Sequence, residues 1–169
     1  MIFYFLIFFF VVLILLIQGA MAAVFPRYIV FPDLLLVFVV SFSFLWGEKK
    51  GLLVGFMGGA VQDLLFGPAF GLFALGKMLV AYLAASASHE VFRDQVVGPM
   101  FVAMFATIAH EVLIYFISYL FLGIHSPIAY MVETVFLPKA VFHFFLTIPV
   151  YPLLYKADRQ NFFQPSIKR

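Results

Sequence analysis

Between Ile2 and Val24 the chain carries no charged residue, and Gln18 is the one strongly polar side chain in that run. A helix of this length rises ~35 Å, enough to cross the ~30 Å hydrocarbon core of a bilayer. No basic segment precedes the run and no clear small-residue cleavage site follows it, which favours a retained span over a signal peptide. The whole chain is 66% apolar and 11% charged, whereas a soluble domain has about a quarter of its residues charged. We therefore predict an integral membrane protein with almost no soluble part.

Similar apolar stretches follow, separated by short turns rich in glycine, proline or charge. We predict an all-α fold with six transmembrane helices in a single domain, residues 1–155, and a short cytoplasmic tail, residues 156–169. The six predicted spans cover residues 2–24, 32–46, 51–66, 72–88, 96–122 and 133–155. The net charge of +2 is too small to indicate nucleic-acid binding, and the absence of cysteine excludes disulfides and thiolate metal sites.

The basic residues favour a cytoplasmic location for both termini. Seven of the eight basic residues outside the spans then fall on the cytoplasmic side, in line with the positive-inside rule. These seven are Lys49, Lys50, Arg93, Lys156, Arg159, Lys168 and Arg169, against Arg27 on the outside.

The third span has a stripe of small residues that ends on a carboxylate. Gly51, Gly55, Gly59 and Asp63 are four residues apart, so they share one face of a helix. Small residues allow neighbouring helices to approach closely within a membrane. At 16 residues this span reaches only ~24 Å, so we expect it to be enclosed by other helices.

Apart from Asp33 and Glu133 at the span starts, four charged residues lie inside predicted spans, and their charges sum to zero: Asp63, Lys77, Glu111 and Lys139. Charges within a membrane are costly unless they are paired. Asp63 and Lys77 lie at similar depth on helices joined by a short turn, so we predict that they form an ion pair. This pair would fix the helix register; a role in binding a ligand or moving a proton is the alternative.

A second polar group is predicted between spans five and six. Thr107, Glu111, Tyr115 and Tyr119 recur every four residues, and Lys139 and His143 are one turn apart. His110 precedes Glu111 directly, so the two side chains diverge, and the H-E-x-x-H metal spacing is absent. We expect structural hydrogen bonds here, with a proton relay as the alternative. Asp33 and Glu133 stand at predicted helix starts, where a carboxylate is a natural cap.

No pattern typical of a nucleophile, a phosphate loop, paired catalytic carboxylates or a metal site is present. We therefore predict no catalytic residue, no metal and no cofactor. A binding or structural role is favoured over an enzyme, and a lipid-handling enzyme is the weakest of the alternatives.

Three segments resemble the rod shape-determining protein MreD family. They are Phe31–Val37, which reads F-P-D-L-L-L-V, the G-x₃-G-x₃-G-x₃-D run of residues 51–63, and the G-x₃-G of residues 67–71. The residues that match the family pattern are Pro32, Asp33, Gly55, Gly59, Asp63 and Gly71.

The resemblance implies a multi-pass protein of the bacterial inner membrane, without catalytic activity, that acts in cell elongation. It implies direct binding to MreC, which has one span and a large external domain. Through MreC it implies contact with MreB, the RodA glycosyltransferase and a penicillin-binding transpeptidase, and so control of lateral peptidoglycan synthesis. The family fold is similar to the substrate-capture (S) subunit of energy-coupling-factor transporters.

These implications place the matching residues in a groove that binds the partner or shapes its site. A substrate-capture subunit for a vitamin-like molecule is the alternative function. Its external pocket would be lined by the stripe of Glu111, Tyr115 and Tyr119.

Overall fold

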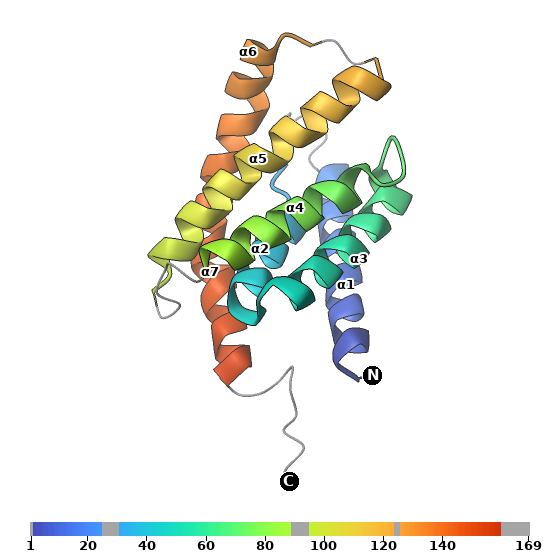
Figure 1. Cartoon of the computed structure of the whole chain (residues 1–169). Coiled ribbons are helices and arrows are strands. Elements are labelled where there is room, and N and C mark those ends of the chain that lie inside the picture. Colours follow the sequence, from blue (N-terminus) through green and yellow to red (C-terminus); the bar gives the residue numbers. More distant parts are fainter. Residues whose placement is uncertain (1, 25–30, 89–94, 124–125, 160–169) are drawn as a thin grey trace.

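The computed structural model describes residues 2–24, 31–88, 95–123 and 126–159, and within these ranges every regular element is a helix. The elements are α1 (Ile2–Val24), α2 (Leu34–Trp46), α3 (Glu48–Phe66), α4 (Leu72–Ala87), α5 (Val97–Phe121), α6 (Ile128–Met131), the π-helical turn η1 (Val132–Phe136) and α7 (Leu137–Arg159). The last three run on as one helix, so the six predicted helices are present (Figure 1).

The predicted helix boundaries are close to those observed, with two clear differences. The last helix begins at Ile128 and ends at Arg159, five residues before and four residues after the predicted limits. Residues 156–159 of the predicted tail are therefore helical, and the rest of that tail lies outside the described residues. The start of α1 and the end of α7 lie at the same end of the bundle (Figure 1).

Three helices are long and apolar enough to cross a membrane: Phe5–Val24, Val97–Phe121 and Ile128–Arg159. Their mean hydropathies are 2.8, 1.9 and 1.4, and most of each surface is not covered by other parts of the described chain. The apolar helices α2 and α4 are shorter. The chain is therefore a membrane protein.

The most enclosed helix is α2. Every residue from Leu35 to Leu45 is buried, and α2 contacts α1, α3, α4, α5 and α7. Its 13 residues rise only ~20 Å, which is tolerable because protein rather than lipid surrounds it. The expectation that the glycine-rich third span is the enclosed helix is wrong. One face of α3 is covered, but Phe56 is 50% exposed and Leu64 is 73% exposed.

The glycines of α3 pack against α4. A Cβ added at Gly59 would lie 2.4 Å from the Cα of Ala74, and one at Gly55 would lie 2.6 Å from the carbonyl oxygen of Lys77. The two backbones are thus in direct contact, as small-residue stripes permit in membrane helices. The predicted packing role of the stripe is confirmed: Gly55 and Gly59 pack against α4, and Gly51 packs against Ser43 of α2.

The turn between α2 and α3 is a single residue. Gly47 has φ of +82°, which residues with a side chain rarely adopt, and it ends one helix and starts the next. This sharp reversal keeps α3 beside α2.

Substitution of two adjacent glycines tests the backbone contact. Gly59→Ala places its methyl group against immovable backbone atoms, whereas at Gly58 the nearest atom is a flexible Leu35 methyl at 3.2 Å. We expect Gly59→Ala to destabilise the fold by about 1–3 kcal/mol. At Gly58 the added methyl group crowds the Leu35 side chain, but alanine favours a helix by about 1 kcal/mol over glycine. These two effects oppose each other, so Gly58→Ala should be nearly neutral. Unfolding temperatures in detergent measure this, and equal temperatures for the two variants would contradict the packing.

Candidate functional site

Asp33 and Lys77 form a buried ion pair. The Lys77 Nζ lies 2.6 Å from Asp33 Oδ2, and their side chains are 0% and 8% exposed. Asp33 Oδ1 accepts a hydrogen bond from the backbone N–H of Leu36, so the same carboxylate also caps α2. The capping role predicted for Asp33 is confirmed. The predicted pair between Asp63 and Lys77 is wrong, because Lys77 binds Asp33 instead.

Asp63 is held by the backbone at the start of α4. Its carboxylate accepts hydrogen bonds from the N–H groups of Gly71, Phe73 and Ala74, at 2.9, 2.8 and 3.1 Å. A helix start offers unpaired N–H donors and a partial positive charge. These donors satisfy Asp63 without a cation, which explains why the predicted partner was not needed. Gly71, with φ of +98°, forms the turn that directs these N–H groups toward Asp63.

A hydrogen-bonded chain joins Asp33 to α7 and α5. The backbone N–H of Asp33 donates to His143 Nε2 at 2.8 Å, so this nitrogen carries no proton. His143 Nδ1 lies 2.8 Å from Thr107 Oγ1, whose own proton is donated to the carbonyl of Ala103. His143 is therefore a neutral ring that donates through Nδ1 and accepts through Nε2.

The predicted polar seam between α5 and the last helix is present. Lys139 Nζ donates to Glu111 Oε1 at 3.0 Å, and the same oxygen lies 3.3 Å from His110 Nδ1. The His110 ring stacks on Phe73 of α4 and fits where Gly76 has no side chain, since a Cβ there would lie 2.8 Å from the ring. His143 does not join Glu111; it binds Asp33 and Thr107 instead.

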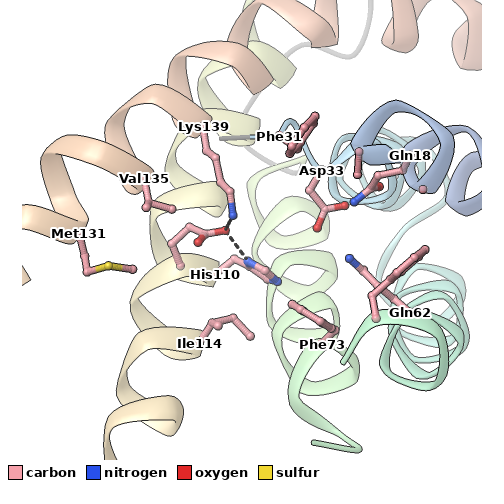
Figure 2. A pocket seen from close by; sticks show the side chains of 14 residues that line it. Gln18, Phe31, Asp33, Gln62, Phe73, His110, Ile114, Met131, Val135 and Lys139 are labelled. Carbon is pink, nitrogen blue, oxygen red and sulfur yellow. Dashed lines mark hydrogen bonds and ion pairs between the residues drawn. The ribbon is translucent and has the colours of Figure 1, made fainter. Parts of the chain in front are cut away.

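A cavity of about 480 Å³ opens beside these groups (Figure 2). Its polar lining residues are Gln18, Asp33, Gln62, His110, Glu111 and Lys139, and the others are Gly19, Ala22, Phe31, Phe66, Phe73, Ile114, Met131 and Val135. On α1, α3 and α5 they lie in the later part of the helix. The others lie in the segment before α2 and near the starts of α4 and the last helix. Because successive helices alternate in direction, all of them lie at the end of the bundle opposite the start of α1.

The last helix reaches this cavity through its π-helical turn. The N–H of Leu137 bonds to the carbonyl of Val132, five residues earlier. Pro138 follows, and proline has no N–H and its ring collides with the carbonyl four residues before it. A wider turn relieves that collision, and such turns are frequent at functional sites. Met131 and Val135 of this region line the cavity.

The residues that match the family pattern separate into different places. Asp33 lines the cavity; Gly55 and Gly59 face α4; Asp63 and Gly71 build the α3–α4 turn. Pro32 lies in a second, smaller hollow with Phe142, Phe145, Leu146 and Pro149. Whether these residues bind a partner stays a prediction.

Sequence reasoning missed Gln62 and did not assign Gln18 to a site. Both are amides in apolar helices, near the same end of the bundle as Asp33, which is the signal that would have grouped them. Of the stripe proposed for a small-molecule pocket, Glu111 lines the cavity. Tyr115 instead donates to the carbonyl of Ser126 at 2.8 Å, and Tyr119 is 46% exposed; neither lines the cavity.

The fold and the cavity define an all-helical membrane protein with a buried polar cluster at one end. No group of three or more potential metal ligands occurs among the residues that the structure covers. Residues 1–159 match the family model of the rod shape-determining protein MreD. The chain therefore belongs to the MreD family, as the motifs in residues 31–71 predicted, and that family determines rod shape. The comparisons with curated proteins and with solved structures find no significant match.

The cap formed by Asp63 can be tested by two substitutions. Asp63→Ala leaves three N–H groups at the start of α4 without their acceptor, and we expect a loss of about 0.5–2 kcal/mol. Asp63→Asn keeps one acceptor oxygen and should lose less. Chemical denaturation in detergent measures the loss, with Glu48→Ala, an exposed acid on the same helix, as the control. Equal stability of Asp63→Ala and Glu48→Ala would contradict the cap.

Proposed function

We propose that this chain is a non-catalytic scaffold of the bacterial inner membrane that binds MreC. Through MreC it acts with MreB, RodA and a penicillin-binding transpeptidase and regulates lateral peptidoglycan synthesis. MreC contacts the chain at the cavity between α1 and the last helix. The family's role in rod shape is the basis for this proposal, and the position of the cavity supports it as the site of contact.

The observation that carries the proposed contact is the one-sided position of the cavity. Every residue that lines it lies at the end of the bundle away from the start of α1. The distribution of basic residues favours the cytoplasmic side for that start, so the cavity would open to the outside. The large domain implied for MreC lies on that side as well.

The open side of the cavity, between α1 and the last helix, also supports a protein partner. Among the described elements, α1 contacts only α2 and α3, so no contact closes the space between α1 and the last helix. Phe66 and Tyr130, near this end, are 50% and 54% exposed. Aromatic side chains of this kind are typical of interface anchors. A membrane-proximal segment of MreC fits such an opening better than it fits the closed faces of the bundle.

A substrate-capture function is the second candidate, and the cavity volume favours it. About 480 Å³ falls within the range of small-molecule sites, roughly 300–1,000 Å³. The likeness to the fold of substrate-capture subunits stays a prediction. A shift in unfolding temperature with one specific vitamin-like molecule, and an ATPase module encoded alongside, would favour this candidate over the scaffold.

A pair of identical substitutions on the last helix tests the scaffold. Val135→Trp fills the cavity, whereas Val141→Trp adds the same bulk at a site that is 52% exposed. We expect Val135→Trp to reduce recovery of MreC in a pull-down at least fivefold at equal protein levels. Val141→Trp should change it less than twofold. Wild-type recovery with Val135→Trp would contradict the cavity as the contact site.

A further inference from the structure

Three buried polar atoms, on side chains that line the cavity, have no hydrogen-bond partner in the described chain. They are Oε1 of Gln18, Oε1 of Gln62 and Nε2 of His110. Gln62 is 4% exposed and His110 is 1% exposed. Figure 2 shows all three side chains reaching into the same space. A buried polar group without a partner costs about 1–3 kcal/mol, so a cluster of three at one cavity indicates a place for a polar ligand.

Each of the three unpartnered atoms is a hydrogen-bond acceptor that lacks a donor. Glu111 Oε1, which faces His110 Nδ1, also accepts from Lys139, and a carboxylate oxygen only accepts. The proton of the neutral His110 ring is therefore on Nδ1, and Nε2 keeps an unshared lone pair next to Gly76. The amide oxygens of Gln18 and Gln62 accept as well. A ligand group with several N–H donors satisfies all three atoms.

The cavity can be reached from the side as well as from the end of the bundle. One wall contains Gln18 of α1 and Gln62 of α3, and the other contains Ile114 of α5 and Val135 of the π-helical turn. Among the described residues, α1 makes no contact with α5, α6 or α7, so these two walls stay apart there. Phe31, Phe66, Phe73 and Met131 add an apolar lining. A molecule that enters from the bilayer therefore meets an apolar surface first and acceptor atoms beyond it.

We propose that the cavity binds the head group of a phospholipid that carries a primary ammonium, such as phosphatidylethanolamine. The three N–H donors of the ammonium match the three acceptors of Gln18, Gln62 and His110. Lys139 keeps two N–H donors beyond its bond to Glu111, and it faces the same cavity, where it can bind the phosphodiester. The acyl chains leave through the opening between α1 and the last helix.

The ligand comparison is between phosphatidylethanolamine and phosphatidylcholine with identical acyl chains. Their head groups share the phosphate and the positive charge, but the trimethylammonium of phosphatidylcholine has no N–H donor. Native mass spectrometry of the purified chain, given an equimolar mixture, should show at least fivefold enrichment of the phosphatidylethanolamine adduct. Equal retention of the two lipids would overturn the proposal.

Two variants locate the site. Gln18→Leu/Gln62→Leu removes two acceptors with similar side-chain volume, and we expect the enrichment to fall below twofold. Gln95→Leu makes the same change at an exposed residue outside the cavity and should keep the enrichment. Enrichment that persists in the double variant would overturn the assignment to this cavity.

A soluble competitor distinguishes the lipid from its head group alone. Glycerophosphoethanolamine carries the same donors without acyl chains, and at millimolar concentration it should leave the lipid adduct in place. Complete displacement would assign the cavity to a soluble amine and overturn the lipid. The test uses the chain without MreC, so its failure leaves the scaffold proposal standing, and failure of the pull-down leaves this inference standing.

Discussion

The ion pair between Asp33 and Lys77 is the interaction on which the cavity end of the bundle depends. A fully buried ammonium is costly unless a carboxylate is in direct contact, and Asp33 supplies that contact at 2.6 Å. The same residue caps α2 through Oδ1 and donates its own N–H to His143. His143 in turn bonds to Thr107. One residue thus ties α2 to α4, α7 and α5, each through a bond with a defined donor and acceptor.

The cavity follows from how the helices are joined around this residue. Asp63 turns toward the N–H groups that start α4, so it fixes the α3–α4 turn instead of competing for Lys77. The last helix has a π-helical turn just before Pro138, and Met131 and Val135 in this region line the cavity. In the part of the chain that the structure describes, α1 contacts only α2 and α3, and the space between it and the last helix is open. A hydrogen-bonded polar centre therefore stands next to an open side of the described bundle.

The sequence was sufficient to predict the helices, since runs of apolar residues broken by glycine, proline or charge leave few alternatives in a membrane. It was also sufficient to predict a polar seam between α5 and the last helix, because helical spacing puts Glu111 in a polar stripe on one span and Lys139 one turn from His143 on the other. The pairing of Asp63 with Lys77 failed because only side chains were considered as partners, whereas backbone N–H groups at a helix start bind a carboxylate equally well. Length alone suggested that α3 was enclosed, but α2 is shorter and has no charged residue. Gln62 escaped notice because its place beside Gln18 and Asp33 depends on which helix ends meet in the fold. The sequence around Gln62 alone does not show this.

A double-mutant cycle on Asp33 and Lys77 tests the central role of the ion pair most directly. Asp33→Asn keeps an oxygen to cap α2 and keeps the N–H that binds His143, so it removes only the charge; Lys77→Met keeps most of the side-chain volume. Each single variant should lower the free energy of unfolding in detergent by about 3–5 kcal/mol, because each leaves one buried charge without its partner. The account predicts that the double variant loses less than the sum of the two, with a coupling energy of about 1–3 kcal/mol. Losses that simply add would contradict it.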